Sequence, residues 1–112
     1  MKKYFAVKEN ERATHIAVEL KYNLGGFNCF TYAQEKRGYY LHVTPVKRET
    51  RDGYTLESFT AFSGYKQLIK EVNRKSSKAE LEAATEAWEI IDIMVERVCR
   101  KNGLELAQEV TA

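Results

Sequence analysis

The sequence has 112 residues, 44% of them hydrophobic and 30% charged, with one proline and a net charge of +2. This length suits one domain with a single core, and the composition excludes a disordered or membrane-spanning chain. The net charge is too small to indicate a nucleic-acid partner, but it is unevenly distributed: residues 1–78 contain 15 Lys and Arg against 8 Asp and Glu, and residues 79–112 contain 3 against 8.

Location and redox state follow from what the sequence lacks. No apolar run is long enough to cross a bilayer, and residues 1–4 lead into an alternating segment without the apolar core of a signal peptide. We therefore expect a cytoplasmic protein with no membrane partner. The two cysteines, Cys29 and Cys99, lack metal-ligand spacing and fall inside predicted elements, so we expect both to be buried, reduced thiols.

The first half of the chain predicts antiparallel strands separated by polar or glycine-containing turns. The expected strands are Tyr4–Glu9, His15–Tyr22, Phe27–Gln34, Tyr39–Arg48 and Tyr54–Phe62. The second of these alternates strictly, which is typical of a strand with one wet face. The third and fourth are expected to form a hairpin that turns about Lys36, which would place Phe30 opposite His42 and Cys29 opposite Val43.

The next segment predicts a short helix. Ser63 can cap it, and its apolar residues recur at helical spacing. These residues are Tyr65, Leu68, Ile69 and Val72. A short link through residues 74–76 would make this helix an antiparallel neighbour of the helix that follows.

The strongest pattern in the chain is a long amphipathic helix from Ser77 to Asn102. Ser77 and Glu80 form a capping box at its start, and Gly103 is placed to end it in the left-handed conformation. Its expected buried stripe consists of Leu81, Ala84, Trp88, Ile91, Val95 and Val98, and Ala87, Ile90 and Met94 widen it to roughly half of the helix circumference. Such a face must be buried against a sheet, because an isolated helix is marginal in water.

These elements predict an α+β fold in which a five-strand antiparallel meander is followed by two C-terminal helices packed on one face of the sheet. We expect one domain over residues 1–112, with the sheet in 1–62, a helical hairpin in 63–103 and a tail in 104–112. The tail either docks through Leu104, Leu106 and Val110 or is left frayed.

Catalytic and metal-binding groups are scarce. Cys29 and His42 are the one candidate nucleophile and base, and the expected register places them on opposite faces of the sheet. The two histidines, His15 and His42, have no third ligand nearby. No glycine-rich phosphate loop joins a strand to a helix. We therefore expect no enzyme, no metal and no cofactor.

A cluster of rings suggests binding. Phe30, Tyr32, Tyr40 and His42 share one hairpin face, opposite the expected core. Exposed aromatic side chains in a cluster stack on bases or anchor a protein partner. The alternatives are that the helices cover this face, or that a homodimer buries it.

Basic residues form a second candidate surface. Lys66, Lys70 and Arg74 recur at i, i+4 and i+8 on the predicted short helix, and Lys75 follows them. Lys36 and Arg37 lie in the strand turn nearby. Such a patch can contact phosphates, and a solvated helix face is the alternative interpretation.

Two stretches resemble small uncharacterised proteins carried on plasmids, integrative elements and phages of Gram-positive gut bacteria. They are residues 25–49 (GGFNCFTYAQEKRGYYLHVTPVKRE) and residues 58–72 (SFTAFSGYKQLIKEV). The resemblance implies a non-enzymatic binding protein that inhibits host defence, as anti-CRISPR proteins do, by binding a protein or nucleoprotein target rather than free nucleic acid. The alternative is a small DNA- or RNA-binding regulator that uses the aromatic face and the basic stripe.

Overall fold

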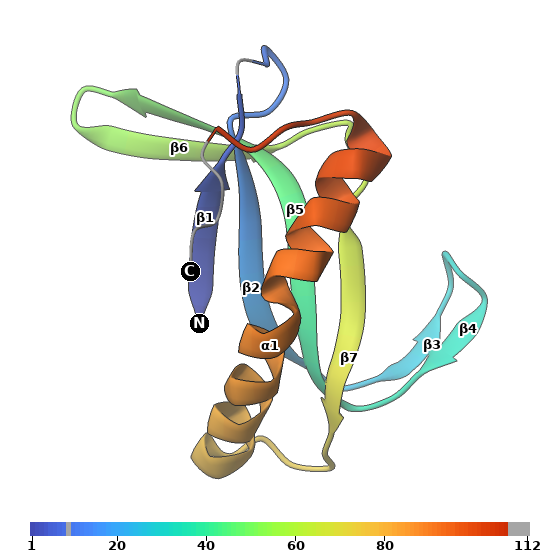
Figure 1. Cartoon of the computed structure of the whole chain (residues 1–112). Coiled ribbons are helices and arrows are strands. Elements are labelled where there is room, and N and C mark those ends of the chain that lie inside the picture. Colours follow the sequence, from blue (N-terminus) through green and yellow to red (C-terminus); the bar gives the residue numbers. More distant parts are fainter. Residues whose placement is uncertain (9, 108–112) are drawn as a thin grey trace.

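The computed structural model describes residues 1–8 and 10–107 of the chain. Its elements are β1 (Lys2–Ala6), β2 (His15–Asn23), β3 (Gly26–Asn28), β4 (Ala33–Glu35), β5 (Gly38–Arg51), β6 (Tyr54–Phe59), β7 (Tyr65–Glu71) and α1 (Ser77–Asn102). They form a five-stranded antiparallel sheet, a separate two-stranded sheet and one long helix that crosses one face of the larger sheet (Figure 1). The predicted α+β class is confirmed, but the part of the chain that the structure describes has one helix instead of two.

Strand β5 is the centre of the sheet. It is 14 residues long, and it pairs with β2 on one edge and with β7 and then β6 along the other. The strand order is β1-β2-β5-β6, with β7 also on β5. The predicted meander is therefore wrong in its third member and in its order, although the sheet does contain five antiparallel strands.

The third predicted strand, Phe27–Gln34, is not part of the main sheet. It folds back on itself as β3 and β4, and β2 pairs directly with β5. Asn23 lies opposite Gly38, and Gly26 lies opposite Glu35, so the same register continues across the break at Gly25. The hairpin thus turns at residues 29–32 and not about Lys36.

The segment 63–72, which the sequence predicts as a short helix, contains strand β7 instead. A bulge interrupts its pairing with β5 between Tyr39 and Tyr40. One extra residue shifts the alternation by one position, so Leu68 lies opposite Tyr40 while Ile69 packs against the core under α1. This shift gives the strand's apolar residues steps of three and four, which resemble a helical repeat.

Helix α1 has the predicted bounds. Its N-cap is Ser76, one residue before the predicted Ser77, because the Ser76 hydroxyl oxygen accepts a hydrogen bond from the N–H of Ala79 at 3.1 Å. Gly103 ends the helix at φ = +67°, as predicted. Acidic Glu80 in the first turn and basic side chains in the last turn complement the helix dipole.

The buried stripe of α1 differs from the prediction in its first half. The buried residues there are alanines, at positions 79, 83 and 87, of which only Ala87 was expected, and larger buried side chains follow from Ile91 onward. The sheet is bulky at that end, because the tilted rings of Tyr22 and Tyr39 lie against each other with centroids 5.2 Å apart, and the Tyr39 hydroxyl donates to the carbonyl of Ser76 at 3.2 Å. Only small residues on the helix fit against these rings.

Two large residues of the predicted stripe consequently face water. Leu81 is 70% exposed, and Trp88 is half-exposed, with its ring 3.9 Å from the Nζ atom of Lys3. The later stripe residues Ile91, Val95 and Val98 are buried, as predicted. A hydrophobicity pattern gives leucine and tryptophan more weight than alanine. The predicted buried face of the helix is therefore displaced around the helix axis from the face that packs on the sheet.

The segment after α1 docks on the outer edge of β1. Leu104 is buried, and Leu106 forms an isolated antiparallel bridge with Val7. The N–H of Lys8 donates to the carbonyl of Glu105 at 2.7 Å, and the N–H of Ala107 donates to the carbonyl of Ala6 at 2.9 Å. Cys99 is buried as predicted. Glu9 at the end of the first predicted strand and Val110 in the predicted tail lie outside the described residues.

A pair of substitutions tests the alanine packing. Ala83→Leu should lower the free energy of unfolding by about 1–3 kcal/mol, because the added atoms have no room against the sheet. Leu81→Ala should change it by no more than about 0.5 kcal/mol, because the leucine is exposed. Chemical denaturation of both variants measures the difference. A costly Leu81→Ala with a neutral Ala83→Leu would show that the helix uses its predicted face.

Candidate functional site on the open face of the sheet

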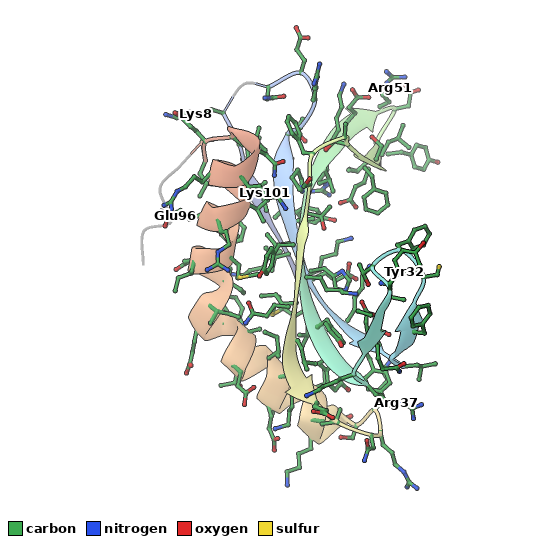
Figure 2. All side chains as sticks on the ribbon, turned by 90° about the vertical axis from the view of Figure 1, so that its right-hand side faces the viewer. Lys8, Tyr32, Arg37, Arg51, Glu96 and Lys101 are labelled. Atoms are coloured by element: carbon green, nitrogen blue, oxygen red, sulfur yellow. The ribbon has the colours of Figure 1, made fainter. Side chains whose placement is uncertain are left out.

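The face of the main sheet opposite α1, which we call the open face, is flanked by two projecting hairpins. The first arm consists of β3, β4 and the turn between them, residues 26–35. The second arm consists of the end of β5 and the whole of β6, residues 47–59, where β5 has passed the end of its pairing with β2. The arms leave opposite ends of the sheet (Figure 1), and both reach to the side away from the helix (Figure 2).

The tip of the first arm presents aromatic side chains to water. Asn28 shapes the turn, because its side-chain oxygen accepts hydrogen bonds from the backbone N–H of Phe30 at 2.9 Å and of Thr31 at 3.3 Å. Phe30 is 90% exposed and Tyr32 is 82% exposed, and the ring of Phe27 is also exposed. Residues 24–34 contain no charged side chain. The tip is therefore an uncharged, apolar projection.

The base of this arm is held in a bent conformation. Gly25 has φ = +75°, and a Cβ atom at this position would lie 2.8 Å from the carbonyl oxygen of Glu35. Arg37 donates from Nε to the carbonyl of Leu24 at 3.0 Å, which ties the two sides of the base together.

The bent base buries Tyr40, which the sequence places on an exposed aromatic face. The Tyr40 hydroxyl donates to the carbonyl of Lys36 at 2.6 Å, and Tyr40 is 6% exposed. Lys66 on β7 lies above this ring, with Nζ 5.2 Å from its centroid, and forms an ion pair with Glu35 at 2.6 Å. Hydrogen bonds from Lys66 and Asn28 lower the pKa of the Glu35 carboxyl. The four predicted ring residues are thus divided: Phe30 and Tyr32 lie at the tip, whereas Tyr40 is under its base.

A depression of about 360 Å³ lies on the open face between β1, β2, β5 and β6. Its lining includes the small or apolar Ala17, Thr44 and Val46, together with His42 and the ring of Phe59. Two pairs of oppositely charged residues complete it. They are Lys2 with Glu57, joined at 3.4 Å, and Lys21 with Glu19, joined at 3.6 Å.

His42, the fourth predicted ring residue, lies within this depression. Burial lowers its pKa, and the positive charges of Lys21 and Lys66 lower it further. Its imidazole is consequently favoured in the neutral form in the folded protein.

The second arm carries exposed apolar residues that the sequence interpretation missed. These are Tyr54, Leu56 and Phe59, and Phe59 is 85% exposed. A signal for them was present in residues 47–59, where charged residues interrupt the apolar ones so often that neither side of the hairpin can cover a core. Such a hairpin is expected to project from the domain.

The predicted basic stripe does not form. Because 63–72 contains a strand, Lys66 lies on the open face, whereas Lys70 points to the helix and pairs with Glu82 at 2.7 Å. The hydrogen-bonded pair of Lys70 and Glu82 raises the pKa of Lys70 and lowers that of Glu82. Arg74 and Lys75 lie in the exposed loop before α1.

The other two predicted basic residues support the first arm. Lys36 pairs with Glu71 at 3.6 Å, and Arg37 donates from Nη1 to the carbonyl of Asn73 at 3.4 Å. Four of the six predicted basic residues are thus engaged within the chain, and Lys66 and Lys70 lie on opposite faces of the sheet.

The candidate catalytic pair is not assembled. Cys29 lies in the turn of the first arm and is exposed, which corrects the expectation of a buried thiol there. The register that would have placed it in the sheet is not formed, and no hydrogen bond joins its sulfur to His42 within the described part of the chain.

Within residues 1–8 and 10–107, no group of three His, Cys, Asp or Glu side chains is arranged to hold a metal ion. In the same residues, no helix combines the length and the apolar character that a bilayer crossing needs. Comparisons with protein-family models, curated proteins and solved structures found no match to the chain.

Substitution of Gly25 tests how the first arm is held. Gly25→Ala should destabilise the protein by more than Gly53→Ala, because both positions have positive φ but only the Gly25 side chain would collide with backbone atoms. It should also make Tyr40 reactive towards tetranitromethane, as read by mass spectrometry of the folded protein. Equal stability losses with an unreactive Tyr40 would contradict this account.

The lowered pKa of His42 predicts acid destabilisation. The unfolded chain binds a proton near the ordinary pKa of about 6.5, before the folded protein does. The stabilisation from neutral His42 is therefore complete above about pH 6.5, and it is lost as the pH falls from there through the folded pKa. The free energy of unfolding should decline less over this range in His42→Gln than in the wild type. His15 is present in both proteins, so its contribution cancels in the difference between them. Parallel curves of unfolding free energy against pH for the two proteins would refute the assignment to His42.

Proposed function

We propose that this chain is a non-enzymatic binding protein that uses its open face, with the two arms, to hold a protein or nucleoprotein target. The observation that carries the proposal is the first arm, which presents Phe27, Phe30 and Tyr32 to solvent from a projection without charge. Exposing several large rings on a bent hairpin lowers solubility and adds nothing to the core. Such projections are typical of sites that anchor a partner.

The second arm and the depression support the same function. Phe59 belongs to both, since its ring is exposed and also lines the depression. A partner held between the arms would bury apolar side chains near the centre and meet paired charges at the rim. This is the anatomy of protein interfaces, in which a few aromatic anchors supply most of the binding energy.

A protein partner is favoured over free nucleic acid. Nucleic-acid binding depends on cations that face phosphates, and rings that stack on bases are accompanied by such cations. The arm tip has none, and Lys66 and Lys70 are occupied by Glu35 and Glu82. The DNA- or RNA-binding alternative therefore loses the basic stripe on which it rested.

The resemblance to proteins of mobile elements suggests which targets to examine first. We propose a component of host defence, inhibited by occlusion in the manner of anti-CRISPR proteins. We also propose that the protein acts in the cytoplasm, where a reducing environment keeps an exposed thiol such as Cys29 unpaired.

Site-specific photocrosslinking tests the proposal. A benzophenone side chain at position 30 should capture a discrete protein from a lysate of the cells that produce the chain. The same group at position 93, where Ile93 is exposed on α1, serves as the matched control. Excess wild-type protein should compete for the capture. The double variant Phe30→Ala/Tyr32→Ala should compete roughly a hundredfold less well, since each lost anchor costs on the order of 1–2 kcal/mol of binding.

Three outcomes would refute the proposal. The first is that position 93 gives the same products as position 30, and the second is that the double variant competes as well as the wild type. The third is binding of a labelled oligonucleotide at low salt that weakens steeply as salt rises, which would favour the nucleic-acid alternative. Because both substituted side chains are exposed, the double variant should fold normally, and chemical denaturation checks this.

A further inference from the structure

Arg48, at the start of the second arm, has a guanidinium group without an acceptor. Its Nε atom is buried and makes no hydrogen bond, and it takes part in none of the ion pairs among the described residues. Buried donors in folded proteins are nearly always paired, because an unpaired one loses its hydration without compensation. The buried Nε therefore costs stability, and the guanidinium that carries it pairs with no carboxylate among the described residues.

The neighbouring carboxylate does not supply the acceptor. Glu57 lies opposite Arg48 in the strand pairing, but its Oε2 atom receives the Tyr4 hydroxyl at 3.0 Å and the Lys2 ammonium at 3.4 Å. Two donors thus hold the Glu57 carboxylate, which also lines the depression.

The guanidinium is held in place by its surroundings. Its Cζ atom lies 3.9 Å from the centroid of the Tyr4 ring, which is a close cation–π contact. The Tyr4 ring in turn meets the His15 ring edge-on at 6.1 Å. The backbone N–H of Arg48 donates to the Thr14 hydroxyl at 2.8 Å, and the same hydroxyl is 2.7 Å from Nδ1 of His15. This network orients Arg48 before any ligand arrives.

We propose that Arg48 binds a carboxylate presented by the protein partner, an aspartate or glutamate side chain seated beside Phe59. The inference rests on the proposed function and names one chemical feature of the partner. Because the Nε atom is buried, the carboxylate would meet the guanidinium at its two Nη atoms, where the planar group matches it in two parallel hydrogen bonds. A phosphate fits less well, because it carries more negative charge and would meet Glu57 on the same face.

The pKa of the nearby His15 reports independently on whether a carboxylate is bound to Arg48. Burial lowers the pKa of His15, and the positive charge of Arg48 lowers it further. A carboxylate bound to Arg48 neutralises this charge, so it should raise the pKa of His15.

The test that needs no partner uses NMR of the wild-type protein. The Nε–Hε resonance of Arg48 is followed during titration with sodium acetate, against sodium chloride at the same ionic strength. We expect a shift for Arg48 with acetate and a rise in the His15 pKa. Arg51 in the same arm, which already pairs with Glu49 at 3.6 Å, should shift little and is the matched control. No selective shift at Arg48, or a selective shift with sodium phosphate instead, would overturn the inference.

The test with the partner uses the crosslinking competition. Arg48→Lys keeps the charge but loses the planar fork, and it should compete about tenfold or more less well than the wild type. Arg51→Lys should compete normally. If Phe30→Ala/Tyr32→Ala fails to compete while Arg48→Lys and Arg48→Met compete fully, the Arg48 inference is wrong and the proposed function stands. Denaturation curves of the Arg48 variants identify any loss that comes from misfolding.

Discussion

The pairing of β2 with β5 is the contact on which the rest of the structure depends. It places β5 in the middle of the sheet, where its free edge receives β7 and β6. Because successive side chains of a strand point to opposite faces, the same register places Leu41 and Val43 under α1 and leaves His42 and Thr44 on the open face. The two arms are also consequences of it, since one continues this hairpin past Gly25 and the other begins where β5 outruns β2.

The bounds of the long helix could be predicted from the sequence, because seven turns of apolar pattern and a closing glycine agree, although the N-cap is Ser76 and not the predicted Ser77. Its contact face could not. Alanines in the first half pack on the sheet because two tyrosines already fill the space, and that depends on residues far away in the chain. The prediction of a helix in the β7 segment was wrong for a different reason. A bulge at Ile69 changes the spacing of the strand's apolar residues into one that a helix also has.

The candidate site was predictable in part. The sequence assigned Phe30 and Tyr32 to the uncovered face of a strand in the main sheet, and both are exposed, but in the turn of a separate hairpin. The burial of Tyr40 depends on how the arm bends, and that bend comes from a left-handed glycine and a hydrogen bond between residues four apart. The basic stripe was inferred from a helix that does not form. An error in one element of secondary structure therefore altered the charge distribution of a whole surface.

The bonds between β1 and residues 105–107 have a consequence for biosynthesis. Ala6 and Lys8 are made about a hundred residues before the backbone groups that pair with them. Pairings so distant in sequence close slowly, and an uncovered strand edge is a site of aberrant association. Until residues 105–107 are in place, the backbone groups of residues 6–8 that pair with them are open to other strands.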